Sequence, residues 1–527
     1  MRRRYRVSLR GGVILSGMIL LSNVPGWASP AFVSEESQIV TTRHQIRVGG
    51  RLLRYTARAG RLPILDNETG QVHAWIFFSD YTLDSPSTGY PRPLTFLWNG
   101  GPGASSSLVH LLGFGPRRLE SDGTVVDNDA TWLDVTDLVF VDPVGTGYSR
   151  PTRAEYGPEF YQTVGDAESI AEFIRVYRNR FRAWEAPIFL VGESYGVIRA
   201  AGVADVLQRK GITVSGIIFI GLTLPLGELS DELRLALMVP TYTAAAFVHK
   251  KLPPELRGDL PSVLAQAEAW ARDVYARALA RRESLSQAER EAVLSQLARF
   301  TGLDPRQINA TTLSISMEQF SELLLADQNQ VVGRYDTRLV GPRDSQQQPY
   351  DPTRDPSLRH IINDVGVVRY FRKELNYQSD LRYQGPFGGG YPPPTTPRGD
   401  WMSTRWKWDY PSAEKTPDAS RQRSPLSMAR AFAEESLRRA LAANPRLRVF
   451  VTCGYYDLVC SYAANSYLAS HAAGGLAERI IARSYGGGHA IYTDRTAAAE
   501  LKRDVAMFIE SAIPQPSPGR FGQKRGK

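Results

Sequence analysis

Residues 187–196 read Pro-Ile-Phe-Leu-Val-Gly-Glu-Ser-Tyr-Gly, an apolar run that ends abruptly in Gly-Glu-Ser-Tyr-Gly. The run predicts a buried strand, and the helical pattern of residues 197–207 predicts a helix directly after it. Glycines on both sides of Ser194 suit a sharp turn, because side chains there would collide with neighbouring backbone. Such a string also occurs by chance in plain turns. The strand before it and the helix after it favour the other interpretation, in which Ser194 is a nucleophile lifted into a cleft.

Further apolar runs predict the remaining strands of one sheet. They are residues 94–98, 137–142, 216–221, 446–452 and 479–485. Helix-period patterns lie between several of them, and a last helix is expected over about 497–512. Residues 44–80 alternate apolar and polar side chains, which is typical of antiparallel hairpin strands. The whole pattern predicts an α/β fold with a central, mostly parallel sheet flanked by helices.

The alternation of strand and helix stops near residue 222. From about 230 to 327 the chain is alanine-rich, charged and helical in pattern, and a polar Pro/Gly-rich stretch with Trp401, Trp406 and Trp408 follows. We therefore expect a largely helical cap, an insertion over residues 230–425 that covers the catalytic face. The core would then comprise residues 29–229 and 426–513. The tryptophans either pack between insertion and core or contact substrate.

The N-terminus has the plan of a secretory signal over residues 1–28. Five arginines precede an apolar run at residues 12–21, which is too short to span a bilayer, and small residues end at Ala28. The protein is therefore expected to be exported, either periplasmic or secreted, with no stable membrane anchor after cleavage. The sequence leaves its oligomeric state open.

The net charge of +9 comes from the two ends of the chain. The five leader arginines and four basic residues of the tail, residues 514–527, account for it, and neither segment holds an acid. The body is near neutral, so charge gives no reason to expect a nucleic acid partner. The tail is expected to be disordered. The two cysteines, Cys453 and Cys460, could form one local bridge or stay free.

Two titratable residues complete a candidate catalytic triad. Asp457 and His489 each follow a predicted strand, and His489 lies within a triple-glycine loop. A serine needs a base to take its proton and a carboxylate to orient that base. Parallel strands gather their carboxyl-end loops into one crevice. The chain order Ser194, Asp457, His489 is that of α/β hydrolases. Neither a metal nor a cofactor is expected.

An oxyanion hole requires amide donors near the nucleophile. The amide of Tyr195 is one candidate, because it follows the nucleophile directly. The glycine-rich loop after the strand at 94–98 offers the other, at Gly100 or Gly101. This loop has no Gly-Lys-Ser or Gly-Lys-Thr, so a phosphate cradle is not favoured.

Five motifs together resemble the serine carboxypeptidases, peptidase family S10. In chain order they are Trp-Asn-Gly-Gly-Pro-Gly-Ala-Ser-Ser (98–106), Asp-Pro-Val-Gly-Thr-Gly-Tyr-Ser (142–149), Gly-Glu-Ser-Tyr-Gly (192–196), Gly-Tyr-Tyr-Asp-Leu-Val-Cys (454–460) and Gly-His (488–489). The resemblance implies an α/β-hydrolase fold with an inserted cap, and release of single residues from the free C-termini of peptides. It places the oxyanion donors at the Gly101 and Tyr195 amides.

The resemblance also implies a site for the substrate's terminal carboxylate. Asn99, the Gly100 amide and Glu193 match its donors, with Glu193 acting in its protonated form. Gly113 stands where the family has a second glutamic acid, so one donor is missing. Two other departures are Ala104, in place of a cysteine, and the stretch from His489 to Tyr492.

The leading hypothesis is a serine carboxypeptidase. If Glu193 donates as the acid, activity should rise as pH falls toward the carboxyl range, and fall once His489 is protonated. An esterase or acyltransferase of the same fold is the enzymatic alternative, because the same triad serves ester chemistry. A hydrolase-like binding protein without activity is the alternative outside enzymes.

Overall fold

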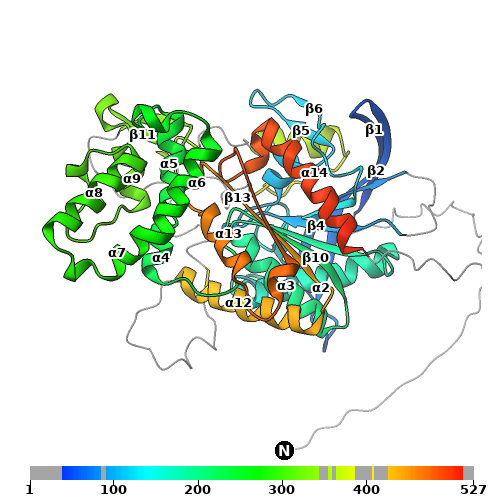
Figure 1. The fold of residues 1–527 in the computed structure, drawn as a ribbon. Helices are drawn as coiled ribbons and strands as arrows, with labels where there is room; N and C mark the ends of the chain where they lie inside the picture. Colours follow the sequence, from blue (N-terminus) through cyan, green and yellow to red (C-terminus); the bar gives the residue numbers. More distant parts are fainter. Residues whose placement is uncertain are drawn as a thin grey trace, which may run out of the picture.

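The computed structural model describes residues 38–84, 91–343, 354–358, 364–385, 406–408 and 425–513. The predicted signal peptide, the basic tail and Trp401 lie outside these ranges. Figure 1 shows a sheet-containing body beside a group of helices drawn in green.

Within the described residues, ten strands form one sheet, in the order β1-β2-β3-β7-β4-β9-β10-β13-β14, with β8 paired to β3. From β7 to β14 the strands are parallel, whereas β1, β2, β3 and β7 pair antiparallel. The strands are β1 (Val40–Val48), β2 (Arg51–Leu65), β3 (Val72–Leu83), β4 (Leu94–Trp98), β7 (Asp137–Val141), β8 (Arg150–Pro151), β9 (Ile188–Glu193), β10 (Val214–Ile220), β13 (Arg448–Gly454) and β14 (Ile480–Tyr485). The predicted α/β fold with a mostly parallel sheet is confirmed.

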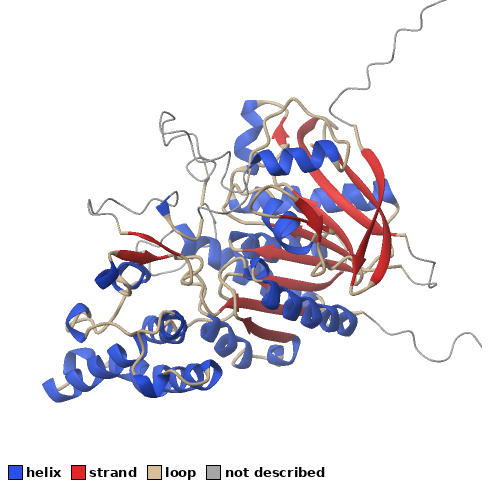
Figure 2. Ribbon diagram, turned by 90° about the horizontal axis from the view of Figure 1, so that it is seen from above, coloured by secondary structure: helices blue, strands red, loops and turns tan. Residues whose placement is uncertain are grey.

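Helices cover both faces of this sheet (Figure 2). One face carries α2 (Thr163–Phe181), α3 (Tyr195–Arg209) and α12 (Pro425–Ala443). The other face carries α10 (Asp364–Lys373), α14 (Arg495–Ala512) and the π-helical turn η2 (Val109–Phe114). Short elements nearby are β5 (Arg117–Leu119), β6 (Val125–Asp127), α1 (Gly157–Phe160) and α13 (Tyr462–Ser470).

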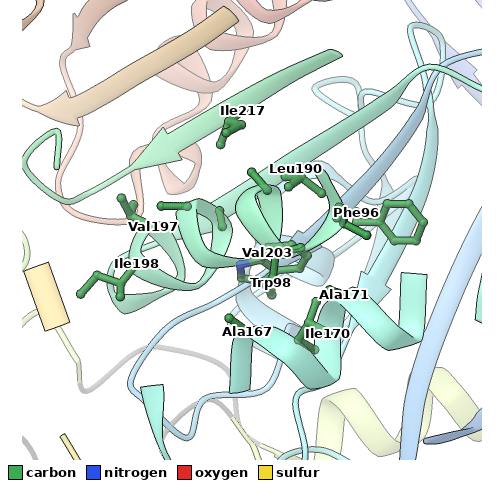
Figure 3. Close-up of a cluster of buried hydrophobic side chains, with 14 of the residues drawn as sticks. Phe96, Trp98, Ala167, Ile170, Ala171, Leu190, Val197, Ile198, Val203 and Ile217 are labelled. Carbon is green, nitrogen blue, oxygen red and sulfur yellow. The ribbon is translucent and has the colours of Figure 1, made fainter. Parts of the chain in front are cut away.

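The central strands are apolar along their whole length because both of their faces are buried. In β9, Ile188 and Leu190 face the α2–α3 layer, and Phe189 and Val191 face the α14 layer. Figure 3 shows Leu190 among side chains of β4, α2 and α3, with Phe96 and Trp98 between sheet and helices. This packing fixes where each strand ends, and hence where the loops after the strands lie.

The green helices follow β10 and have a hydrophobic cluster of their own. They are α4 (Asp231–Ala236), α5 (Val239–Val248), α6 (Leu260–Trp270), α7 (Ala276–Ala280), α8 (Gln287–Thr301) and α9 (Met317–Leu323), followed by the hairpin of β11 (Gln330–Val332) and β12 (Val340–Pro342). The helical pattern expected over 230–327 is confirmed. Leu458, next to Asp457, packs into this cluster. In contrast, α10 packs against the sheet, where Phe371 contacts Phe77 edge-on.

Local sequence explains several helix boundaries in this group. Ser286 and Glu289 form a reciprocal capping box at the start of α8, and Gly302 ends that helix at a φ of 69°. Ser316 and Gln319 form another capping box at α9, and the Ser230 side chain caps α4 by accepting from the Leu233 amide. None of the helices in the described ranges is both long and apolar enough to cross a membrane.

The close contact of α3 with its neighbours depends on Gly202. A Cβ atom there would lie 2.7 Å from the ring of Phe432 in α12 and 2.8 Å from Cβ of Ala167 in α2. We expect Gly202→Ala to lower the free energy of unfolding by about 1–3 kcal/mol, because overpacking outweighs the helix propensity of alanine. Urea unfolding would measure the change.

Gly258→Ala is the control for this substitution. Nothing lies within 4 Å of a Cβ atom at Gly258. We expect its effect to stay within about 0.5 kcal/mol. Equal unfolding midpoints for Gly202→Ala and the unsubstituted protein would contradict the packing argument.

Candidate active site

Ser194 lies at the turn between β9 and α3, with φ of 56° and ψ of −129°. A left-handed φ is unfavourable for a serine and marks a strained turn. The Ser194 amide donates a 2.8 Å hydrogen bond to the carbonyl of Ile220, at the end of β10. Cβ atoms at Gly192 and Gly196 would lie 1.9 Å from the Gly196 carbonyl oxygen and 2.9 Å from the Trp98 ring. The predicted strand, turn and helix are confirmed, and close backbone approach explains both glycines.

His489 and Asp457 form a buried pair. His489 Nδ1 lies 2.7 Å from Asp457 Oδ2, and the Val459 amide donates to Asp457 Oδ1 at 2.9 Å. His489 Nε2 is buried and has no hydrogen-bond partner among the described residues. A neutral imidazole whose Nδ1–H is held by a carboxylate presents a lone pair at Nε2. The pair can therefore accept a proton at Nε2.

The charges of this pair stabilise each other. Burial lowers the pKa of His489, but the charge and hydrogen bond of Asp457, with the charge of Glu193, raise it by more, so the pKa of His489 is raised overall. Burial raises the pKa of Asp457, and His489 opposes that rise. The imidazolium form of His489 is thus better stabilised here than in water.

The loops of the three residues meet at the carboxyl ends of neighbouring strands. The Ser194 amide binds the carbonyl of Ile220, and Gly221 is the next residue. A Cβ atom at Gly221 would lie 3.0 Å from Cε1 of His489. A Cβ atom at Gly454, at the end of β13, would lie 2.0 Å from the carbonyl oxygen of Gly487. The nucleophile turn and the His489 ring therefore flank the end of β10, and the Asp457 and His489 loops are in contact.

Residues 333–339, here called the strap, bind the His489 loop. The His489 amide donates to the Tyr335 carbonyl at 2.6 Å. Arg338 Nη1 donates to the Gly486 carbonyl at 2.9 Å, and Arg338 is also paired with Asp336 and Asp494. The backbone around His489 is therefore fixed by a segment that is distant in sequence.

The same strap also holds the Asp457 loop. The Leu458 amide donates to the Arg334 carbonyl, and the Thr337 amide donates to the Tyr456 carbonyl, both at 3.0 Å. Sequence reasoning missed residues 333–339. No pattern in them indicates a role, because all of these contacts except those of the Arg338 side chain are made through backbone groups.

A disulfide joins Cys453 and Cys460. Of the two possibilities left open by the sequence, the structure has the bridge. It encloses Asp457 in a short loop, which limits the conformations that this loop can adopt.

The glycine-rich loop after β4 lies against the nucleophile turn. A Cβ atom at Gly100 would lie 2.4 Å from the Tyr195 amide nitrogen and 2.7 Å from that of Gly196. Gly101 has a φ of 101°, which excludes most other residues. Tyr195 is the first residue of α3, where helix geometry leaves amides without an intrahelical acceptor. The loop and the helix start thus bring amide groups together beside Ser194.

Asn99 is held from both sides. Its Nδ2 donates to Glu193 Oε2 at 3.0 Å, and its Oδ1 accepts from the Val109 amide at 3.2 Å. Arg199, fully buried in α3, donates to the Asn99 carbonyl at 2.7 Å and pairs with Asp166 at 2.7 Å. Sequence reasoning missed Arg199. Its signal was an arginine among the apolar residues of a buried helix.

Glu193 is the last residue of β9 and is 3% exposed. Its Oε2 accepts hydrogen bonds from Asn99 and from the hydroxyl of Tyr492. Burial raises the pKa of Glu193 to about 7; the His489 charge and the two hydrogen bonds oppose the rise, and the Asp457 charge adds to it. Near neutral pH, the acid and the carboxylate of Glu193 are therefore both populated.

Tyr492 is a second residue that sequence reasoning missed. Its ring lies over Gly113, where a Cβ atom would be 3.2 Å from Cγ and Cδ2 of Tyr492. Gly113 and the stretch after His489 were noted as separate departures from the family pattern. That both departures occur in one chain was the only hint in the sequence that they are related. Only the fold shows that Gly113 and Tyr492 are in contact.

Trp406 and Trp408 lie edge-on to the ring of Tyr195, with centroids 5.4 Å and 5.7 Å away. Trp406 belongs to the core cluster between the sheet and α2, α3 and α12, so packing is confirmed for it. Among the described residues, no three His, Cys, Asp or Glu side chains are grouped so that they could hold a metal ion.

Three comparisons relate this chain to known proteins. The profile of a family described as serine carboxypeptidase matches residues 53–365, which is more than half of the chain. The pheromone-processing carboxypeptidase KEX1 of Tuber melanosporum is 31% identical over 160 residues, 30% of this chain and 24% of that protein. The kex1 protein of Aspergillus niger is 30% identical over 196 residues, 36% and 30% of the two chains. The chain thus matches only a quarter to a third of these relatives' length.

Among solved structures, the prohormone-processing carboxypeptidase Kex1 of Saccharomyces cerevisiae is 17% identical, with a TM-score of 0.45 and coverage of 86% of this chain and 91% of that one. A proline iminopeptidase of Mycobacterium smegmatis is 12% identical, with a TM-score of 0.35 and coverage of 86% and 98%. The family assignment rests on the profile match. This chain belongs to the serine carboxypeptidase family.

Proposed function

We propose that this protein is an exported serine carboxypeptidase that hydrolyses the C-terminal peptide bond of peptides through an acyl-enzyme. The observation that carries the proposal is the buried His489–Asp457 pair beside the strained turn of Ser194. Family membership supports it, and the names of the fungal relatives describe carboxypeptidases.

Acylation begins at Ser194. Its Oγ attacks the carbonyl carbon of the final peptide bond, and its proton passes to Nε2 of His489. Asp457 holds the Nδ1–H tautomer and stabilises the imidazolium, in line with the raised pKa of His489. The oxyanion of the tetrahedral intermediate accepts from the Gly101 and Tyr195 amides.

The same base completes the cycle. His489 donates its proton to the leaving amine, and the C-terminal residue departs as a free amino acid. Water then attacks the acyl-enzyme, with His489 taking its proton, and Ser194 is regenerated. No metal or cofactor has a role in these steps.

The free C-terminus of the substrate is recognised by Asn99, the Gly100 amide and Glu193. A neutral Glu193 donates a hydrogen bond to the terminal carboxylate, whereas an ionised Glu193 repels it. The pKa of about 7 places this change near neutral pH. We further propose that the insertion over residues 230–425 supplies the cap over this site through its helices α4 to α9, whereas its α10 packs against the sheet, and that the signal at 1–28 directs the protein to the periplasm or outside the cell.

The first test compares N-blocked dipeptides with their C-terminal amides and with simple esters across pH. We expect the kcat/KM ratio of acid to amide to be about tenfold or more below pH 7, and to fall above it as Glu193 loses its proton. Both substrates use the same triad, so the titration of His489 cancels in this ratio. The steady-state rates at which the free amino acid is released from the acid, and the amino acid amide from the amide, measure it.

Ser194→Ala serves as the blank and is expected to lose about 10⁶-fold in kcat. Equal rates on acid and amide at every pH would contradict carboxylate recognition. A preference for esters together with inert peptides would instead favour the esterase alternative.

A second test replaces Glu193 by glutamine. The glutamine NH₂ donates at every pH, so the acid-to-amide ratio of Glu193→Gln should no longer fall above pH 7. The matched control is Glu172→Gln, because Glu172 is also a buried carboxylate but pairs with Arg175 on α2. A Glu193→Gln enzyme with the original pH profile and dipeptide affinity would exclude the assigned role.

A further inference from the structure

The two oxygens of the Glu193 carboxyl have different surroundings. Both hydrogen bonds, from Asn99 Nδ2 and from the Tyr492 hydroxyl, end on Oε2. No described residue donates a hydrogen bond to Oε1. An oxygen that already accepts two donors has little capacity for a proton. When Glu193 is neutral, its proton therefore resides on Oε1.

Tyr492 reaches Glu193 because of the two-residue period of β9. Phe189 and Val191 face the α14 layer, and Glu193 continues the same face. Tyr492, in the turn η13 (Ile491–Thr493), is fully buried in that layer. Its carbonyl accepts from Arg118 Nη1 at 3.1 Å, which holds its backbone. Tyr492 is thus held at its backbone carbonyl by Arg118 and at its hydroxyl by Glu193.

Gly113 provides the space for the Tyr492 ring. A Cβ atom at this position would lie 3.2 Å from Cγ and Cδ2 of that ring, closer than an ordinary contact. Phe114, the next residue of η2, packs edge-on against the same ring, with 5.0 Å between the two ring centroids. Any side chain at position 113 would therefore compete with Tyr492 for this place.

We propose that Tyr492 is a positioning residue of the carboxylate-binding site: its hydroxyl binds Oε2 of Glu193 and leaves Oε1 to donate to the terminal carboxylate of the substrate. This inference rests on the function proposed above. The second acidic donor remains absent at Gly113, but the glycine gives room to a tyrosine hydroxyl that orients the one remaining acid.

The charged and titratable groups around Glu193 come from several elements. The charge of His489 lowers the pKa of Glu193, the charge of Asp457 raises it, and the Tyr492 and Asn99 hydrogen bonds lower it. Burial, followed by the charge of Glu193, raises the pKa of Tyr492 far above its usual value, against the charge of Arg118. Tyr492 thus stays a donor at working pH. Because it stabilises the carboxylate, its removal should favour the acid.

The test is Tyr492→Phe, which deletes the hydroxyl and keeps the ring over Gly113. In this variant we expect the pH at which the acid-to-amide ratio of kcat/KM falls to move upward by about one unit. The ratio below that pH should decrease, because a carboxyl without its second donor can also place its proton on Oε2. The kcat/KM for the amide should change less than that for the acid.

The matched control is Tyr177→Phe. Tyr177 is likewise a buried tyrosine that donates to a buried carboxylate, Asp80 Oδ2 at 2.9 Å, and Asp80 lies in β3, which β7 and β4 separate from β9 in the sheet. In Tyr177→Phe, the pH at which the acid-to-amide ratio of kcat/KM falls, here called the inflection, should equal that of the unsubstituted enzyme. An unchanged inflection in Tyr492→Phe would overturn the inference even where the unsubstituted enzyme prefers acids. If the unsubstituted enzyme shows no such preference, it is the proposed function that fails.

Gly113→Ala tests the same contact from the other side. Its Cβ atom must displace the Tyr492 ring by a few tenths of an ångström and weaken the bond to Glu193. We expect a smaller upward shift of the inflection in the enzyme with Tyr492, and no additional shift in the Tyr492→Phe background. If Gly113→Ala shifted the inflection equally with and without the Tyr492→Phe substitution, or in neither case, the proposed coupling between Gly113 and the Tyr492 hydroxyl would be wrong.

Discussion

The left-handed backbone of Ser194 determines the arrangement of everything around it. A turn this tight requires the strand before it and the helix after it to approach closely, and Gly192 permits this. The same turn brings the first amides of α3 against Gly100, and the alternation of side chains along β9 places Glu193, the residue before the turn, on the opposite face of the sheet from Gly192. On the proposed mechanism, the nucleophile Ser194 and the oxyanion donor at the Tyr195 amide thus depend on one backbone conformation.

The candidate site is also one electrostatic unit. Glu193, Asp457 and His489 are buried together. The charges of His489 and Asp457 affect the pKa of Glu193, and the charges of Asp457 and Glu193 raise the pKa of His489. A protonated His489 favours the carboxylate form of Glu193, and an ionised Glu193 favours the imidazolium. On the proposed mechanism, the pH at which a free C-terminus binds and the pH at which His489 acts as the base are therefore linked. A change at either residue alters both.

Much of this architecture could be predicted from local sequence. Apolar runs buried on both faces predict the strands at 94–98, 137–141, 188–193, 214–220, 448–454 and 480–485. The two glycines that flank Ser194 predict the sharp turn between β9 and α3. The strap could not be predicted, because apart from the Arg338 side chain it acts through backbone amides and carbonyls that any residue supplies. Tyr492 and Gly113 lie far apart in sequence and meet only through packing. The disulfide followed from no pattern beyond the spacing of Cys453 and Cys460.

The pairing of β10 with β13 has a consequence for how the site is assembled. Gly216 pairs with Arg448, and the helices α4 to α9 lie between them in sequence. The Ser194 turn and the Asn99 loop precede this long excursion in sequence, whereas Asp457, His489 and Tyr492 come after it. Contacts of such long range form late, because the chain must first close a large loop. On the proposed mechanism, a chain still being synthesised or exported carries a serine without its base. It cannot cleave peptides, its own unfolded segments included, until its last strands have docked.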